Sequence, residues 1–331
     1  MQFKYLKNRF NEMMNRYVGY GIPCFKKMLL LLDFIYSYII YGASISDYFT
    51  FAFYKLNHEG RKEYITYRKY LKIQKCCNDS SKIEICRNKA LFNRYFSDYI
   101  GRQWLDINEC TYEEFSLFIQ NHPVIFAKEV NGFRGIGVSR VDMSKEEPEK
   151  FYARLRMDKE LHYIIEEEIS QSPILNQFHP WSINTIRIVT LYDDKNDVVH
   201  VMKARIRIGN NMNNVDNLHY NGIGANIDIS SGIIDSVGRD SNNNKYICHP
   251  ITGTQIVGFK IPYWLECVEY AKAAAKAIPQ VRYIGWDIVI RDNGSFLLIE
   301  ANDNADHDFQ QIFNGGLWYQ YKSILERLCT Y

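Results

Sequence analysis

Two apolar runs joined by Asn293-Gly294 constrain the fold of this chain more than any other feature. Residues 285–304 read GWDIVIRDNGSFLLIEANDN. Asn-Gly between two such runs is the strongest short hairpin signal, because both central residues of a type I′ turn need a positive φ. A two-residue loop predicts three facing pairs: Asp292 with Ser295, Ile290 with Leu297, and Asp287 with Glu300.

The last of these pairs brings two carboxylates face to face, with Cβ atoms roughly 4.5–5.5 Å apart. Asn302 follows Glu300 by two residues and therefore points to the same face of the strand. Two carboxylates and an amide oxygen suit a hard cation such as Mg²⁺. The alternative is a surface hairpin with solvated charges, but the runs WDIVI and FLLIEAN are too apolar for that.

Composition describes an ordinary globular chain of 331 residues with 47% hydrophobic residues. The formal net charge of +2 gives no global reason to expect a nucleic-acid partner, so anion recognition has to be local. The 8 cysteines include no C-x-x-C pair that would indicate a zinc site. Reduced thiols in a cytoplasmic protein are the expectation.

Residues 28–45 form an apolar stretch interrupted by Asp33, shorter than the roughly 20 residues that a spanning helix needs. The stretch also lacks the layout of a signal peptide. A buried or interfacial helix is therefore expected. The basic residues around it are Lys4, Lys7, Arg9, Arg16, Lys26 and Lys27. They allow peripheral attachment to an anionic membrane, at the inner face, or a basic helical lobe packed on the body.

The spacing of apolar residues along the chain changes near residue 124. Residues 1–120 have apolar positions at helical spacing, whereas short β-rich runs follow, interrupted by a helix predicted over residues 264–278. This order predicts an α+β fold with a helical N-terminal lobe over residues 1–85 and a body over residues 86–331. The body divides into a helical lead-in (86–123), a nucleotide-clamp lobe (124–180) and a catalytic and metal lobe (181–331).

A glycine-rich turn follows the run VIFAKE, and its glycines are Gly132, Gly135 and Gly137. Glycines let backbone N–H groups approach phosphate oxygens, although such a turn is more often only a hairpin. Lys128, at the end of the preceding strand, favours an anion site. The acidic run Glu166-Glu167-Glu168 ends another apolar strand. It is either a solvated strand end or an edge that binds adenosine.

A row of cations lies on one face of the run VMKARIRIG: Lys203, Arg205 and Arg207, with Arg187 on a preceding strand. The row is either an exposed edge that prevents aggregation or the floor of a cleft that neutralises carboxylate and phosphate groups. His307 is a candidate general base, although an ordinary surface residue is the favoured interpretation.

In this order the motifs resemble the ATP-grasp superfamily and, within it, the sugar-transfer-associated group of surface-polysaccharide biosynthesis. The matching residues are Asn88-Lys89 with Phe92, Ile100-Gly101-Arg102, residues 124–137 and 164–169, Ser182-Ile183-Asn184-Thr185-Ile186-Arg187, residues 205–209, Val215-Asp216-Asn217, residues 222–224, His249-Pro250, Gly258-Phe259, Ile261-Pro262, Gly285-Trp286-Asp287 and residues 300–302. They cover roughly residues 85–312, and Asp47-Tyr48-Phe49 is similar to the N-terminal part of the group.

The resemblance implies two α+β lobes that clamp ATP. Lys89 and Lys128 would contact phosphates, with the glycine turn closing over them. Glu166 and Glu167 would lie at the adenine hinge, and Glu168 near the ribose. Asp287, Glu300 and Asn302 would hold Mg²⁺, while Arg205, Arg207 and Arg187 would act in catalysis. The candidates for substrate contact are Ser182, Asn184, Thr185 and Asn217.

The function implied is an ATP- and Mg²⁺-dependent carboxylate–amine ligase that forms an amide through an acyl phosphate. Its substrates would be a uronic acid or another sugar-linked carboxylate and an amine or amino acid. Two alternatives stay open. One is phosphoryl transfer from ATP to a hydroxyl, and the other is a non-catalytic nucleotide-binding scaffold for a polysaccharide assembly complex.

Overall fold

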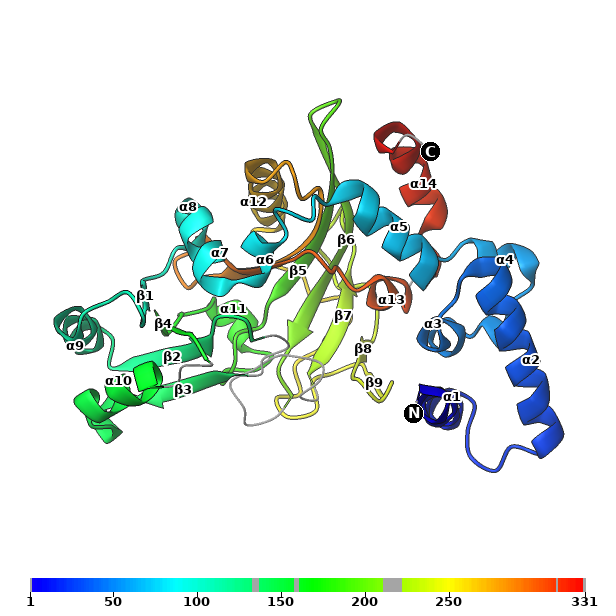
Figure 1. Ribbon diagram of the computed structural model, residues 1–331, viewed down its shortest axis with the longest axis horizontal. Coiled ribbons are helices and arrows are strands. Elements are labelled where there is room, and N and C mark those ends of the chain that lie inside the picture. Colours follow the sequence, from blue (N-terminus) through cyan, green and yellow to red (C-terminus); the bar gives the residue numbers. More distant parts are fainter. Residues whose placement is uncertain (1, 133–136, 158–160, 211–221, 314, 330–331) are drawn as a thin grey trace. The chain divides into compact units, whose positions relative to one another are not determined.

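The computed structural model describes residues 2–132, 137–157, 161–210, 222–313 and 315–329, and they form two compact units. The helical unit comprises residues 1–79, 193–198 and 304–331. The sheet unit comprises residues 80–192 and 199–303. Helices and antiparallel sheets together confirm the predicted α+β class (Figure 1).

The helical unit is built on a core of aromatic and methionine side chains. Its elements are α1 (Gln2–Tyr17), α2 (Cys24–Tyr41), α3 (Ile45–Thr50), the 3₁₀ helix η1 (Phe53–Lys55), α4 (His58–Lys62), α5 (Tyr67–Cys77), α13 (His307–Gln311) and α14 (Trp318–Leu328). Met14, Tyr48, Phe49 and Phe53 are almost completely buried at its centre. None of the helices among the described residues combines the length and the apolar character that crossing a membrane requires.

The end of the chain, residues 304–331, groups with this helical unit, and the predicted boundaries of the catalytic and metal lobe stay a prediction. Ile65 donates its backbone N–H to Gln311 Oε1 at 2.8 Å, and Trp318 donates to the carbonyl of Glu63 at 2.7 Å. Cys76 and Cys329 form a disulfide, so the expectation of reduced thiols is wrong for this pair. These bonds depend on tertiary contacts between distant segments, which local patterns do not reveal.

His307 is buried, and its interpretation as an ordinary surface residue is wrong. Its Nε2 lies 2.9 Å from Asp47 Oδ1, and its ring stacks on that of Tyr70 at 4.6 Å between centroids. Asp47 also closes the capping box of α3 with Ser44. Burial works to lower the pKa of His307, but the hydrogen bond to Asp47 outweighs it and raises that pKa. His307 therefore serves the packing of the helical unit.

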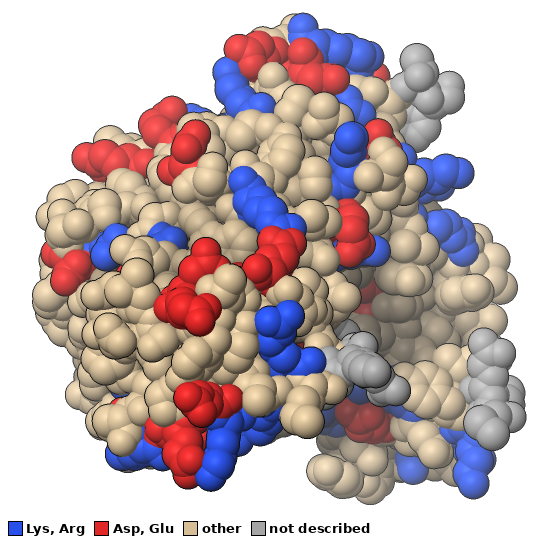
Figure 2. Space-filling view, turned by 60° about the vertical axis from the view of Figure 1, so that its left-hand side comes forward, with Lys and Arg blue, Asp and Glu red and all other residues tan. Residues whose placement is uncertain are grey.

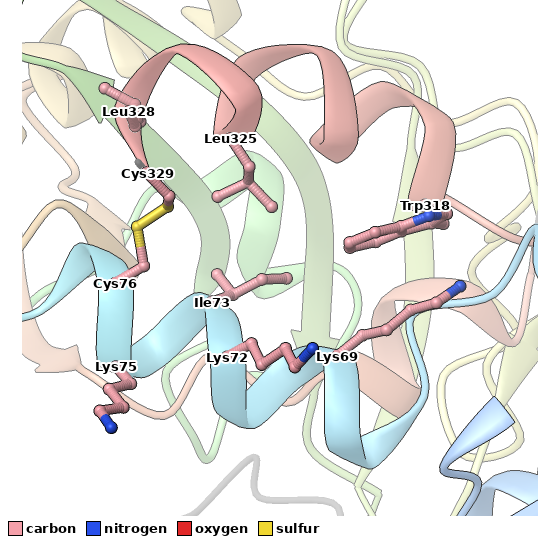
Figure 3. A pocket seen from close by; sticks show the side chains of 9 residues that line it. All are labelled: Lys69, Lys72, Ile73, Lys75, Cys76, Trp318, Leu325, Leu328 and Cys329. Atoms are coloured by element: carbon pink, nitrogen blue, oxygen red, sulfur yellow. A yellow bond between two sulfur atoms is a disulfide. The ribbon is translucent and has the colours of Figure 1, made fainter. Parts of the chain in front are cut away.

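A pocket of about 440 Å³ lies between α5 and α14 within the helical unit (Figure 3). Its lining includes Lys69, Lys72 and Lys75, together with Trp318 and the disulfide. Lys69 Nζ lies 4.4 Å from the Trp318 ring centroid, and burial lowers the pKa of Lys69 to about 8. None of the residues assigned to catalysis or binding by the sequence lines this pocket.

The small sheet of the sheet unit has the strand order β1-β4-β2-β3. Its strands are β1 (Trp104–Asp106), β2 (Val124–Glu129), β3 (Val138–Asp142) and β4 (Tyr163–Glu167), paired antiparallel. Helices α9 (Tyr112–Asn121) and α10 (Pro148–Met157) cover one face, where Ile125 and Ile165 pack with Phe115 and Phe151. Thr111 and Glu114 form the predicted capping box of α9. The other face carries Lys128 and Glu166.

The large sheet has the order β11-β10-β5-β6-β7-β8-β9. Its strands are β5 (Ile186–Asp193), β6 (Val198–Ile208), β7 (Ile223–Ile227), β8 (Gly238–Arg239), β9 (Lys245–Tyr246), β10 (Tyr283–Ile290) and β11 (Phe296–Asn302). Ile188, Ile206 and Trp286 on its apolar face pack with Phe96 and with Trp264 of α12 (Trp264–Ala277), close to the predicted helix. The remaining helices are α6 (Glu84–Arg87), α7 (Lys89–Tyr95), α8 (Ser97–Ile100), α11 (Pro173–Asn176) and the 3₁₀ helix η2 (Met143–Lys145).

The β10–β11 hairpin differs from the predicted one at its turn. Arg291 pairs with Ser295 through a 2.8 Å backbone hydrogen bond, so the loop has three residues, and of Asn293 and Gly294 only Gly294 has a positive φ (81°). The predicted pairs Asp292 with Ser295 and Ile290 with Leu297 are therefore wrong, and Ile290 faces Phe296.

A register shift between Asp287 and Ile288 compensates for the longer loop. Ile288 faces Leu298, but Asp287 faces Glu300, so Ile299 is the extra residue of a β-bulge. The predicted pairing of Asp287 with Glu300 is confirmed, because the bulge restores the register that the loop had shifted by one residue.

Candidate functional site

The face of the large sheet opposite its apolar core carries a row of buried charged side chains. Arg187 lies on β5, Arg205 and Arg207 on β6, and Asp287 on β10; each is at most 8% exposed. Strand β6 is hydrogen-bonded to β5 on one side and β7 on the other. The alternative of an exposed edge strand is therefore wrong, and the arginines form the floor of a buried polar face.

Asp287 is held by two of these arginines. Arg187, directly opposite in the register, binds both carboxylate oxygens through Nε and Nη2, the latter at 2.7 Å from Oδ2. Arg207 Nη1 lies 2.8 Å from the same Oδ2. Burial works to raise the pKa of Asp287, but the charges of Arg187 and Arg207 outweigh it and hold that pKa well below its usual range. Asp287 is thus a permanent anion neutralised by protein cations.

Glu300 lies beside this cluster and is paired less closely than Asp287. Its side chain is 40% exposed, and Arg187 Nη2 is 3.6 Å from its Oε1. Asn302 donates from Nδ2 to the same oxygen at 3.1 Å. Desolvation and then the negative charge of Asp287 raise the pKa of Glu300. The structure thus brings together the three residues that the hairpin pattern assigned to a metal.

The donor set fits a hard divalent cation. Carboxylate and amide oxygens are the ligand types that Mg²⁺ takes in proteins. In this structure the Asp287 oxygens accept from Arg187 and Arg207, and the Glu300 carboxylate, beside Asn302, is the more accessible of the two. Because Glu300 is partly exposed and the Asp287 charge disfavours its ionisation, an added cation here would lower the cost of keeping both groups ionised. The metal assignment stays a prediction supported by this chemistry.

Lys128 lies on the small sheet at the centre of a buried ion-pair network. Its Nζ is 2.6 Å from Glu166 Oε2 on the neighbouring strand. Arg102 binds Glu166 through Nε and Nη2, each at 2.8 Å, and Asn93 donates to Oε1 at 3.0 Å. Burial works to raise the pKa of Glu166, but Arg102 and Lys128 hold it below its usual range. Glu166 therefore positions Lys128.

The sequence did not predict that Arg102 and Asn93 contact Glu166. Arg102 stood among the residues of the resemblance, but nothing in its spacing pointed to Glu166, which is far away in sequence. Beyond Glu166, Arg102 also donates to the backbone carbonyl of Leu298 in β11. It therefore ties the small sheet to the hairpin strand that carries Glu300.

The side chains of the acidic run Glu166-Glu167-Glu168 point in different directions, because side chains alternate between the two faces of a strand. Glu166 points into the buried network, whereas Glu167 lies 3.4 Å from His122 Nδ1. Glu168, 45% exposed, pairs with Arg140 Nε at 2.7 Å. The assignment of these residues to adenine and ribose stays a prediction, and in this structure only Glu167 and Glu168 are close to solvent.

The glycine turn joins β2 to β3, and its ends are described whereas residues 133–136, including Gly135, lie outside the described residues. Gly137 has a φ of 74°, a left-handed conformation that favours glycine, and a Cβ built there would lie 2.4 Å from Glu129 Cδ, near the end of a flexible side chain. Lys89, at the start of α7, donates from Nζ to the carbonyls of Glu129 (2.9 Å) and Gly132. Burial lowers the pKa of Lys89. Lys89 thus fixes the backbone at the start of the glycine turn.

The predicted substrate residues are buried in the segment before β5. Ser182 Oγ lies 2.8 Å from His179 Nδ1, and Asn184 donates from Nδ2 to the carbonyls of Leu175 (3.1 Å) and His179 (3.0 Å). The carbonyl of Thr185 accepts from Arg207 N at 2.8 Å. These contacts position β5 and β6, and contact with substrate stays a prediction. Asn217 lies outside the described residues.

One face of the molecule shows how its surface charges are distributed (Figure 2). Over the face drawn in Figure 2, Lys and Arg side chains of the described residues are interspersed with Asp and Glu side chains. The charges that are concentrated are the buried ones on the two sheets.

Comparison with known proteins gives a family. The family model described as sugar-transfer associated ATP-grasp matches residues 149–324, more than half of the chain. No curated protein matches the sequence.

Three solved structures that this chain resembles are remote in sequence. The ATP-grasp ligase PsnB complexed with minimal precursor is 14% identical, with a TM-score of 0.47 over 76% of this chain and 63% of that chain. N5-carboxyaminoimidazole ribonucleotide synthetase from Thermotoga maritima is 10% identical, with a TM-score of 0.38 over 67% and 42%. D-alanine-D-alanine ligase from Coxiella burnetii is 10% identical, with a TM-score of 0.38 over 74% and 56%. The chain covers less than two thirds of each of these proteins.

Proposed function

The chain belongs to the sugar-transfer associated ATP-grasp family, and from this premise we propose that it is an ATP- and Mg²⁺-dependent carboxylate–amine ligase. The carboxylate would be carried by a sugar acid, and an amine or amino acid would be joined to it. We further propose that the reaction belongs to the biosynthesis of a surface polysaccharide such as capsule or O-antigen, in the cytoplasm, where ATP is available.

The observation that carries the proposal is the unequal treatment of two facing carboxylates. Asp287 is neutralised by Arg187 and Arg207, whereas Glu300 is half-exposed, adjacent to Asn302, and has a raised pKa. If the cluster had only a structural role, Asp287 alone would suffice to pair with the arginines. The second carboxylate, Glu300, is the kind of group that a site for a metal and a charged substrate retains.

In the first step, an oxygen of the substrate carboxylate attacks the γ-phosphorus of ATP and the bond to the β-phosphate oxygen breaks, giving an acyl phosphate and ADP. Lys128, fixed by Glu166, would neutralise phosphate oxygens, and Lys89 would hold the glycine turn near them. When bound by Asp287, Glu300 and Asn302, Mg²⁺ would neutralise charge on the phosphates. Arg205 and Arg207 would orient the carboxylate.

In the second step, the amine nitrogen attacks the acyl carbon, the carbon–oxygen bond to phosphate breaks, and one amine proton leaves with the phosphate. Arg205 on β6 would stabilise the negative charge that develops on the acyl oxygen. Neither step needs a side-chain nucleophile, so positioning and electrostatic stabilisation carry the chemistry.

The test is phosphate release by the purified chain with ATP, Mg²⁺ and a panel of sugar acids and amines. The proposal expects release that requires both an acid and an amine, with one amide formed per ADP. A stable phosphorylated product without an amine would indicate a phosphotransferase. Tight ATP binding with no turnover under any pairing would indicate a nucleotide-binding scaffold.

A further inference from the structure

Helix α2 of the helical unit exposes a broad apolar face. Between Phe25 and Ile40, every exposed residue except Lys26 and Lys27 is aliphatic, aromatic or methionine. Phe25 is 66% exposed, Leu32 56% and Ile39 60%, which is far from the burial expected of such side chains. A contiguous patch of this kind on a helix indicates an interaction surface.

The other side of α2 fixes the helix to the protein. Leu30, Ser37 and Tyr41 are buried against the helical unit. Asp33 accepts from Arg61 Nη1 at 2.8 Å and Nη2 at 2.9 Å, so the acidic residue of this helix, whose side chain is 33% exposed, is neutralised within the unit. The helix therefore presents its apolar face in a defined orientation, along the edge of its unit (Figure 1).

Helix geometry shows how the charges border this face. At 100° per residue, the exposed apolar positions cover an arc of roughly 200° that contains no charged residue. Lys27 lies roughly 20° outside one margin of this arc, and on the other side Asp33 and then Lys26 follow at roughly 20° and 40°; both lysines are in the first turn of the helix. Lys4 and Lys7 of the preceding α1 are exposed, and no carboxylate among the described residues pairs with them. The face is thus apolar along its length, with Lys26 and Lys27 near its first turn.

We propose that α2 is an in-plane anchor that binds an anionic membrane surface. Its roughly 27 Å of length would lie parallel to the bilayer, with the apolar arc among the acyl chains and the lysines against anionic headgroups. Tyr36 and Tyr38 on the exposed face have the amphipathic rings that favour the membrane interface. Lys26 and Lys27 can extend their ammonium groups to the headgroups from either margin.

The charge pattern favours lipid over a second copy of the chain. An apolar arc this wide exceeds the stripe that one packed helix covers. Two such faces brought together would also bring the lysines at the margins near each other, and the one carboxylate of α2, Asp33, is already paired with Arg61. Anionic headgroups provide the negative charge that Lys26 and Lys27 need at the first turn of the helix. The proposal is independent of the ligase activity, because it concerns the helical unit alone.

The test is sedimentation of the full chain with vesicles of phosphatidylcholine that contain phosphatidylglycerol, beside vesicles of phosphatidylcholine alone. We expect binding to the anionic vesicles that weakens as salt is raised. The pair Leu32→Glu and Ile39→Glu should lower binding by at least about tenfold. Each of Lys26→Ala and Lys27→Ala should lower it roughly fivefold for anionic vesicles.

The matched controls are Leu117→Glu on α9, where the leucine is 60% exposed, and Lys150→Ala on α10, whose side chain is 78% exposed. Both should bind like the native chain, and unchanged circular dichroism spectra should accompany every variant. Absence of binding to anionic vesicles by the native chain would overturn the proposal. So would α2 variants that turn a dimer into a monomer in light scattering while binding vesicles unchanged, because that result assigns the face to a second copy.

Discussion

Arg102 binds Glu166 with two nitrogens at 2.8 Å each, and the same guanidinium donates to the Leu298 carbonyl of β11. One buried ion pair thus joins the small sheet to the strand that carries Glu300. Because Glu166 also holds Lys128 at 2.6 Å, the proposed phosphate and metal groups are positioned through a single carboxylate.

Glu166→Gln should therefore cost both stability and nucleotide binding. The change leaves Arg102 buried without its counter-charge, which typically lowers the free energy of unfolding by about 3–5 kcal/mol. The KM for ATP should rise because Lys128 loses its main partner. Urea unfolding and steady-state kinetics measure the two effects. Glu168→Gln is the control: its salt bridge is exposed, so a change of about 0.5 kcal/mol or less is expected. Equal effects of the two variants would contradict the assignment.

The acid dependence of unfolding provides a second test of this network. The folded state holds the pKa of Glu166 below its usual 4.5, so the unfolded chain binds the proton more readily. The stabilisation is then complete above that ordinary pKa and is lost as the pH falls below it. The Glu166→Gln variant should show a shallower loss of stability in this range than the native chain. Parallel curves would mean that the ion pair contributes nothing at neutral pH.

Local pattern predicted part of this arrangement well. The apolar runs around Asn293-Gly294 gave the hairpin, and the alternation in β6 gave Arg205 and Arg207 on one face, because both follow from the two-residue period of a strand. The turn was wrong because the Asn-Gly signal does not distinguish a two-residue loop from a three-residue loop with one left-handed glycine.

Long-range partners could not be predicted. Nothing in the local sequence pairs Glu166 with Arg102, or Cys76 with Cys329, since both depend on how distant segments pack. The bulge at Ile299 is a similar case. The bulge restores the register of Asp287 and Glu300. The predicted pairing of these two residues is therefore right, although the predicted two-residue turn is wrong.

Replacing each of the two facing carboxylates, Asp287 and Glu300, with the corresponding uncharged amide should have different effects. Glu300→Gln should abolish Mg²⁺-dependent phosphate release with little change in stability, because the side chain is 40% exposed. Asp287→Asn should also destabilise the fold by about 3 kcal/mol, because Arg187 and Arg207 lose their buried counter-charge. Thermal unfolding and a Mg²⁺ titration of activity separate the outcomes. Full activity in the Glu300→Gln variant would remove the hairpin from the mechanism.

The glycine turn offers a test of the proposed phosphate contact. In Gly137→Ala, the new Cβ would lie 2.4 Å from Glu129 Cδ and the residue would keep a φ of 74°. We expect about 2 kcal/mol of destabilisation from the left-handed conformation and the clash together, and a raised KM for ATP. Gly253→Ala is matched in φ, at 71°, but has no atom within 4 Å of its Cβ, so it measures the conformational cost alone. An unchanged KM in the Gly137 variant would place nucleotide binding elsewhere.

The disulfide between Cys76 and Cys329 should make the stability of the helical unit depend on redox state. The two residues are 253 positions apart, and a loop of that length corresponds to at most about 5 kcal/mol in the chain-entropy description. Dithiothreitol should lower the Tm of the oxidised protein. The double variant Cys76→Ser, Cys329→Ser should melt at the lower temperature with or without the reductant. Cys24→Ser, which changes an exposed free thiol, should behave like the native chain. Alkylation would confirm that dithiothreitol has reduced both thiols. If the Tm of the native chain is then unchanged, packing of α14 on α5 holds the end of the chain without the covalent bond.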